Sequence, residues 1–140
     1  MDKFEKLFAE YPCTLTDELV KKNTADILAK HTEENNTREV WMQCLHQIDL
    51  TTLNGEDTTA KVAQMAARVN DFDGHFPGVP NVAAMCVYPA LVETAKEVLT
   101  EPIGIAAVAA GFPASQTFVE IKVAEAAMAV AAGATEIDIV

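Results

Sequence analysis

Two long apolar stretches in the second half of the chain restrict the fold more than any other feature. Residues 81–89 read NVAAMCVYP and residues 103–113 read IGIAAVAAGFP, with none of the polar alternation of a one-sided strand. Such runs are typical of parallel strands covered on both faces. The segment between them, ALVETAKEVLT, has the composition of a helix, and Pro89 suits its first turn. The pattern therefore predicts a strand, a helix and a second, parallel strand.

The same alternation continues on both sides of these stretches. QIDLTTL predicts an earlier strand, and DTTAKVAQMAARVND predicts an amphipathic helix after it. Towards the C-terminus, the pair Thr117 and Glu120 has the spacing of a capping box that opens a helix. Gly133 is suited to end that helix, and TEIDIV predicts a fourth strand. The expected order is β-α-β-α-β-α-β.

This order leaves two fold classes, the doubly wound parallel sheet and the (β/α)8 TIM barrel. No glycine-rich phosphate loop follows the first strand, which disfavours the doubly wound class. A full barrel takes roughly 250 residues. We therefore expect residues 47–140 to form the first half of a barrel, strands 1–4, and residues 1–46 to form an N-terminal helical extension. The barrel is also favoured by polar residues within or at the ends of strands: Asp49, Thr51, Cys86 and Asp138.

Composition disfavours several classes of function. The 140 residues carry a formal net charge of −11, which argues against a nucleic-acid partner because such proteins need a basic surface. No apolar stretch is long enough to cross a bilayer, and the polar N-terminus is not a targeting signal, so we expect no membrane partner and a cytoplasmic location. Cys13, Cys44 and Cys86 lack metal-ligand spacing, and the common nucleotide and metal motifs are absent. We expect no metal and no cofactor.

Asp138 is the most conspicuous polar residue of a strand. In EIDIV, Ile137 and Ile139 share one face while Glu136 and Asp138 share the other. If the isoleucines face the helices, Asp138 points into the barrel, where a carboxylate is costly without partners. It is either a salt-bridged or capping aspartate, or an acid/base group of a site.

Other candidates lie at the ends of the first three strands. Asp49, Thr51 and Asn54 cluster in IDLTTLN, although Asn54 before Gly55 is also an ordinary turn. Cys86 is either a substrate-facing residue or an inert packing cysteine. The loop AAGFPASQT offers backbone N–H groups to an anion, or it is a plain loop with a helix cap.

Four motifs together resemble the deoxyribose-phosphate aldolases, class I aldolases built on a (β/α)8 barrel. They are IDLTTLNGEDT, VAAMCVYP, GFPAS and GATEIDIV, which follow in the order seen in the family over about residues 47–140. The resemblance implies a lyase that reversibly cleaves 2-deoxy-D-ribose 5-phosphate to acetaldehyde and glyceraldehyde 3-phosphate through a lysine Schiff base. It also implies a small phosphorylated sugar or aldehyde substrate, a role in deoxyribonucleotide catabolism and a homo-oligomer.

The resemblance assigns roles to particular residues. Asp138 is implied to be a proton-relay residue, and Cys86 is implied to lie beside the substrate. Asp49, Thr51 and Asn54 are implied to form a polar cluster near the substrate.

In the family the Schiff-base lysine lies on the sixth strand, so it is not in this chain. Lys61, Lys96 and Lys122 fall on predicted helices, and we interpret them as solvated. We expect the chain to be a truncated, inactive part of an aldolase. The alternatives are a non-catalytic half-barrel that acts as a scaffold or self-association module, and a different sugar-phosphate enzyme with a doubly wound sheet.

Overall fold

A computed structural model describes residues 2–12 and 14–140. Cys13, one of the three cysteines considered above, lies outside the described residues. The chain divides into two compact units, Met1–Val40 and Trp41–Val140. The first unit therefore ends at residue 40, whereas the predicted N-terminal extension ends at residue 46.

The first unit is helical. Helix α1 (Lys3–Glu10) begins with a capping box between Asp2 and Glu5, and α2 (Asp17–Asn35) begins at Thr16, whose hydroxyl accepts a hydrogen bond from the Leu19 N–H. Neither helix has a buried residue. A third helix, α3 (Arg38–Leu45), spans the division between the units.

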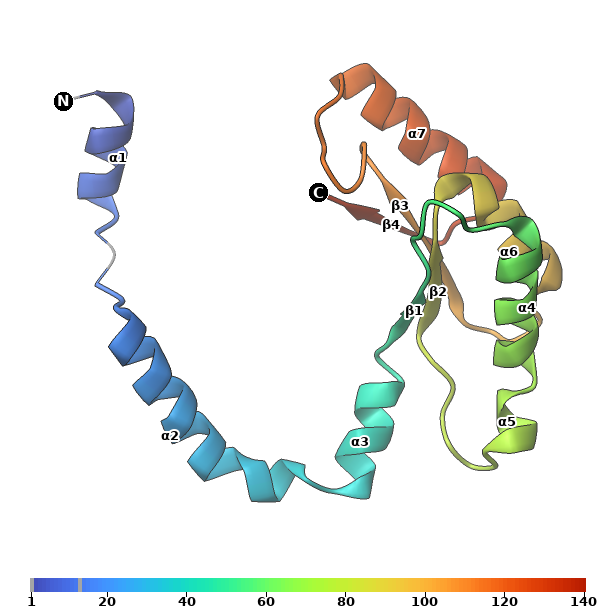
Figure 1. Ribbon diagram of the computed structural model, residues 1–140, viewed down its shortest axis with the longest axis horizontal. Coiled ribbons are helices and arrows are strands. Elements are labelled where there is room, and N and C mark those ends of the chain that lie inside the picture. Colours follow the sequence, from blue (N-terminus) through green and yellow to red (C-terminus); the bar gives the residue numbers. More distant parts are fainter. Residues whose placement is uncertain (1, 13) are drawn as a thin grey trace. The chain divides into compact units, whose positions relative to one another are not determined.

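The second unit contains one sheet of four parallel strands. They are β1 (Asp49–Thr51), β2 (Ala84–Val87), β3 (Gly104–Ala109) and β4 (Glu136–Ile139), hydrogen-bonded in the order β1-β2-β3-β4 (Figure 1). The prediction of four parallel strands of a barrel-type α/β fold is confirmed. Each strand pairs with the next one along the chain, as in a sheet that winds in one direction.

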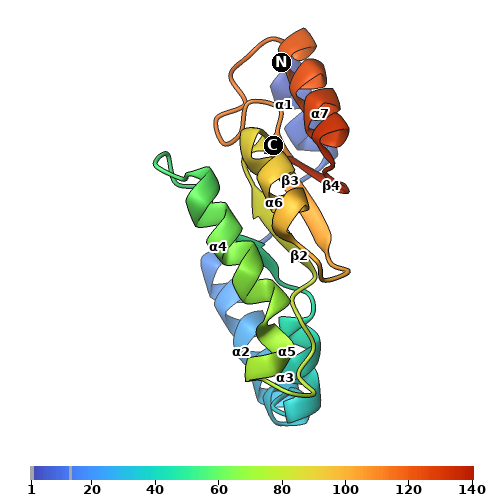
Figure 2. The ribbon, with the colours of Figure 1, turned by 90° about the vertical axis from the view of Figure 1, so that its right-hand side faces the viewer.

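Helices connect successive strands and cover one face of the sheet. They are α4 (Thr59–Asn70), the short α5 (Phe72–His75), the 3₁₀ turn η1 (Pro89–Leu91), α6 (Val92–Val98) and α7 (Val119–Ala132). Figure 2 shows α4, α6 and α7 following one another across this layer. As predicted, Pro89 lies in the first turn of its helical segment, and Gly133 ends α7 with a left-handed φ of 115°.

Side-chain alternation divides the strand residues between two apolar clusters. The larger cluster lies between the sheet and the helices and includes Met85 and Val87 of β2. The smaller cluster lies on the opposite face of the sheet and contains Ala84, Cys86, Ala106 and Val108. Both faces of β2 and β3 are therefore apolar, which explains why their sequences show no alternation.

The capping box predicted at Thr117 and Glu120 is wrong. Helix α7 begins at Val119, and its N-cap residue is Phe118, which makes no side-chain cap. The preceding loop contains three residues in left-handed backbone conformations, because Ala110, Gly111 and Ser115 have positive φ values of 64°, 76° and 59°. Local sequence spacing does not report such a loop.

Candidate functional site

The strand register brings four of the predicted site residues to one face. Thr51 pairs with Cys86, Cys86 with Ala106, and Ala106 with Glu136, which makes one level across all four strands. Asp49 lies one level below, opposite Ala84, and Asp138 lies one level above, opposite Val108. Paired residues of parallel strands point to the same face. This face, opposite the helices, is called the inner face below; its polar residues are Asp49, Thr51, Cys86, Glu136 and Asp138.

The inner face combines a buried thiol with exposed carboxylates. Cys86 is 3% exposed, whereas Asp49, Glu136 and Asp138 are exposed. Burial raises the pKa of the Cys86 thiol, and the negative charges of Asp138, Asp49 and Glu136 raise it further, against an opposing hydrogen bond with Thr51. The thiol is therefore neutral at pH 7, which suits an apolar wall better than a nucleophile.

Cysteine alkylation tests this electrostatic arrangement. At pH 8 we expect iodoacetamide to modify the exposed Cys44 well before Cys86. Asp138→Asn should lower the pKa of Cys86, because it removes a nearby negative charge, and should thereby raise the thiolate fraction and the alkylation rate. Mass spectrometry of the modified peptides gives both rates. Equal rates for Cys86 in the wild type and the variant would show that Asp138 does not act on the thiol.

Glu136 was not among the predicted site residues. Its carboxylate lies over Gly104, the first residue of β3. A side chain at position 104 would collide with it, because an added Cβ would lie 2.3 Å from Glu136 Oε1 and 3.1 Å from the Ala84 Cβ. The glycine thus leaves room for this side chain at the start of β3. The signal was present in the sequence, because alternation already placed Glu136 on the same face as Asp138.

Asn54 lies in the turn that follows β1, outside the strands that form the inner face. A carboxylate from the same turn, Asp57, organises its surroundings. Asp57 Oδ2 accepts from the Thr52 hydroxyl at 2.8 Å and from the Asn54 backbone N–H at 3.0 Å. Asp57 Oδ1 lies 2.5 Å from Lys61 Nζ. Asn54 therefore differs from the other predicted site residues: it is held by hydrogen bonds within the turn at the carboxyl end of β1 and not by the strand register.

The ion pair changes the titration of Asp57. Its pKa is lowered to about 2, chiefly because of the hydrogen bond from Lys61, with help from Thr52 and Asn54 and against the effect of burial. A pKa that is lower in the folded state stabilises the fold above the unfolded value, here 3.8, and this contribution is lost as the pH falls towards 2.

This linkage gives a second prediction. Asp57→Asn should lower the free energy of unfolding at pH 7, and the difference from wild type should shrink between about pH 4 and pH 2. Urea unfolding followed at several pH values measures it. Glu56→Gln, in the same exposed turn, is the control and should leave the profile unchanged. A difference that stays constant down to pH 2 would contradict the role of the Asp57 charge.

Two of the three lysines on α4, α6 and α7 are bonded to neighbouring side chains. Lys61 is exposed, as predicted, and its ammonium pairs with Asp57, whereas Lys122 is half-buried and its ammonium donates to the Ser115 hydroxyl. Lys96 is exposed on α6, as predicted, and its aliphatic chain lies against Gly133. The four strands themselves contain no lysine or arginine.

Polar groups of the GFPAS loop are hydrogen-bonded within the loop, to α7 and to the residue after β4. The Gly111 N–H donates to Glu125 Oε2 at 2.9 Å, and the Ser115 N–H donates to the Gly111 carbonyl at 2.8 Å. The Ser115 hydroxyl donates to the Val140 carbonyl at 3.0 Å. With a carboxylate already at the Gly111 N–H, the ordinary loop is the better of the two interpretations.

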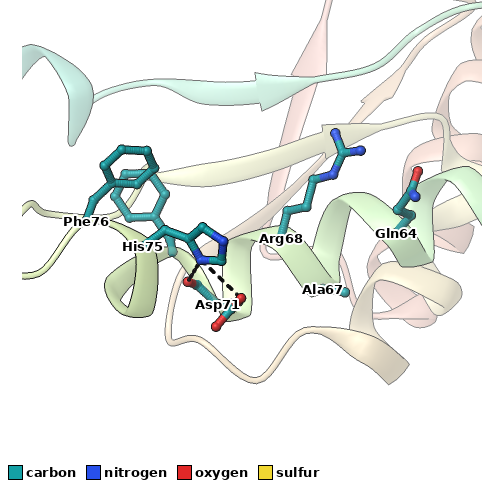
Figure 3. Close-up of a pocket in the computed structure, with 7 residues that line it drawn as sticks. Gln64, Ala67, Arg68, Asp71, His75 and Phe76 are labelled. Atoms are coloured by element: carbon teal, nitrogen blue, oxygen red, sulfur yellow. Dashed lines mark hydrogen bonds and ion pairs between the residues drawn. The ribbon is translucent and has the colours of Figure 1, made fainter.

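Apart from the inner face, the molecule has a groove of about 590 Å³ on the outer side of α4 and α5 (Figure 3). Of its three ionisable groups, Asp71 and His75 pair with each other at 3.1 Å, and the third is Arg68. The rings of Phe72 and Phe76 lie 5.1 Å apart. The groove lies on helices, away from the strand residues described above. Its lining is Gln64, Ala67, Arg68, Asp71, Phe72, His75 and Phe76.

Residues 2–12 and 14–140 contain no group of three or more His, Cys, Asp or Glu side chains placed to hold a metal ion. In the same residues, no helix is both long and apolar enough to span a membrane.

Comparison with known proteins identifies relatives. The chain is 35% identical over 134 residues to human deoxyribose-phosphate aldolase, which covers 86% of this chain and 42% of the human protein. A solved Coccidioides immitis protein assigned as a deoxyribose-phosphate aldolase matches 90% of this chain and 48% of its own, with 22% identity and a TM-score of 0.60. The tetrameric deoxyribose phosphate aldolase of Aeropyrum pernix matches 77% and 43%, with 20% identity and a TM-score of 0.60.

The curated relatives and the solved structures support different conclusions about this chain. The solved structures share the fold, and the curated relatives share sequence over most of this chain. No family model matches. The chain spans about two fifths of the length of the curated relatives, 42% for the human protein. The resemblance that the four motifs indicated is confirmed.

Proposed function

We propose that this chain, a relative of the deoxyribose-phosphate aldolases, forms the first four strands of an aldolase barrel that reversibly cleaves 2-deoxy-D-ribose 5-phosphate to acetaldehyde and glyceraldehyde 3-phosphate. One observation carries the proposal: the register gathers Thr51, Cys86 and Asp138 on the face of the sheet opposite α4, α6 and α7. Relatives with this name align with 86% of the chain.

The residues of the inner face would divide the work of such a reaction. A lysine amine attacks the substrate carbonyl and water leaves, and the protonated imine then accepts the electron pair of the breaking carbon–carbon bond. Asp138 would move protons as a general acid and base. The neutral thiol of Cys86, with Ala106 and Val108, supplies an apolar wall, and Thr51 offers a hydroxyl. This chemistry needs neither a metal nor an organic cofactor.

The lysine itself is the missing part of this scheme. No strand of the sheet carries one, and the ammonium groups of Lys61 and Lys122 are engaged by Asp57 and Ser115. We propose that the 140-residue polypeptide does not catalyse the reaction alone and that the amine comes from polypeptide outside these residues.

A chimera tests the proposal. Residues 1–140 are joined to the segment of human deoxyribose-phosphate aldolase that follows its aligned part, and acetaldehyde release from 2-deoxy-D-ribose 5-phosphate is measured. The chimera should be active and the 140-residue chain inactive. A chimera that folds by circular dichroism but releases no acetaldehyde would contradict the assignment, and release by the chain alone would contradict its dependence on added polypeptide.

The wider biology follows from the same assignment and is part of the proposal. The substrate is a small phosphorylated sugar or aldehyde, and the compartment is the cytoplasm. A homo-oligomer is proposed because β1 and β4 are edge strands of the sheet and apolar side chains are exposed, among them Ile139 of β4 at 64% and Val123 of α7 at 63%.

These exposed surfaces also favour a second candidate, a non-catalytic scaffold that pairs two copies across the inner face. Electrostatics disfavours it. Each copy would bring the carboxylates of Asp49, Glu136 and Asp138 to the enclosed interior, where like charges without cations are costly. A cation-bearing partner fits this face better than a second copy.

Light scattering distinguishes the two candidates. If the carboxylates prevent pairing, the triple variant D49N/E136Q/D138N should form dimers at concentrations where the wild type does not. Salt should promote association of the wild type by screening the repulsion. A wild-type dimer that is stable at low salt and unchanged in the triple variant would favour the scaffold.

A further inference from the structure

The turn after β1 is built around a carboxylate that solvent does not reach. The Asp57 side chain is 1% exposed, although the turn itself lies at the surface. Besides Lys61, it accepts from Thr52 and from the Asn54 backbone. The turn is also tied to the inner face, because the Tyr88 hydroxyl donates to the Leu53 carbonyl at 3.2 Å and the Tyr88 ring packs on the Cys86 cluster.

These contacts decide which way the Asn54 amide points. A carboxylate can only accept hydrogen bonds, so Asp57 Oδ1, 3.4 Å from Asn54 Nδ2, requires the nitrogen on its side. Thr52 spends its hydroxyl proton on Asp57, so its oxygen offers only lone pairs to Asn54 Nδ2 at 3.3 Å. A reversed amide would place its oxygen against two acceptors.

The amide oxygen is consequently turned away from the turn. Within residues 2–12 and 14–140, Asn54 Oδ1 accepts no hydrogen bond, and Asn54 is exposed. It lies three residues beyond Thr51, at the carboxyl end of β1, the end at which sites of parallel α/β barrels are found. An oxygen fixed in this way selects for hydrogen-bond donors, such as a hydroxyl, and against phosphate oxygens.

We infer that Asp57 is a positioning residue that holds Asn54 as an acceptor for a hydroxyl group of the sugar. The inference rests on the proposed function and adds to it a division of the substrate: the hydroxyl-bearing end meets the turn after β1, and the phosphate lies elsewhere. Thr52 takes part by presenting its lone pairs to the same amide.

The orientation is measured first, by ¹H–¹⁵N NMR of the full chain. The Asn54 side-chain amide protons should exchange with solvent roughly fivefold more slowly than those of the exposed Asn36, the effect of one typical hydrogen bond. Asp57→Asn should remove this protection, whereas Glu56→Gln should keep it. Protection that is absent in the wild type, or retained in Asp57→Asn, would overturn the inference. If Asp57→Asn does not fold, Thr52→Val removes one of the two acceptors and should reduce the protection.

The recognition step is measured next, by titrating the chimera described above with 2-deoxy-D-ribose 5-phosphate and separately with inorganic phosphate. Only the sugar phosphate should shift the Asn54 amide resonances. In Asp57→Asn that shift should vanish, while the backbone signals of Cys86 and Asp138 still respond.

The outcomes separate this inference from the function on which it rests. A sugar phosphate that shifts Cys86 and Asp138 but not Asn54, or phosphate that shifts Asn54 equally, would overturn the inference and leave the proposed function standing. A sugar phosphate that shifts none of the three would contradict both.

Discussion

Asp138→Asn should lower kcat of the chimera described above by about 10²–10⁴-fold, the usual contribution of a positioned acid/base group. The reason is its place on the inner face, one level above Cys86 and opposite Val108, where strand register aims the carboxylate away from the helices. Asparagine keeps the shape of the side chain but cannot exchange a proton. KM should change much less than kcat, because the lost interaction is made in the transition state.

The control for this variant is Asp26→Asn, on the exposed surface of α2. It makes the same chemical change far from the sheet in sequence and should leave kcat unaltered. An Asp138→Asn chimera with undiminished kcat would show that the aspartate is structural. Equal losses of activity and of folded protein would lead to the same conclusion.

Met85→Ala should lower the free energy of unfolding by about 2–5 kcal/mol, the range for large-to-small changes in a packed core. Met85 is fully buried in β2, between the sheet and the helical layer. Truncation there removes apolar contacts and leaves a cavity that neighbouring strands cannot close. Among the described residues it is the largest fully buried side chain.

Met128→Ala is the matched control, since this methionine on α7 is 72% exposed. It should change stability by less than about 0.5 kcal/mol. Urea unfolding monitored by circular dichroism measures both variants, with the midpoint shifting and the slope unchanged. A loss below about 1 kcal/mol for Met85→Ala would mean that the core between sheet and helices is not packed as described.

The strands were predictable because burial on both faces leaves a plain signal. In β2 and β3 neither face meets water, so the apolar runs of the sequence mark them directly. In β4 the period of two predicted the face of Asp138, and the register with β3 agrees. The short β1 was identified from IDLTTL, in which Leu50 alone packs against the helix side.

Features that depend on contacts across the chain were not predictable. The start of α7 was misplaced because the preceding loop is held by Glu125, fourteen residues beyond Gly111, whose N–H it accepts. Lys61 follows Asp57 by four residues, so the ion pair itself is local, but nothing in the sequence indicated that the carboxylate would be only 1% exposed in the folded turn. The approach of the Glu136 side chain to Gly104 likewise requires β3 and β4 to be neighbours in the sheet.

We propose that these 140 residues present an aldolase-like acid/base face without the amine that must serve it. Trapping with sodium borohydride in the presence of acetaldehyde tests this most directly, because reduction converts any lysine imine into a stable ethyl-lysine adduct. Mass spectrometry should find no specific, stoichiometric adduct on the 140-residue chain, and one adduct on the chimera at a lysine that follows residue 140. A stoichiometric adduct at Lys61, Lys96 or Lys122 would contradict the claim.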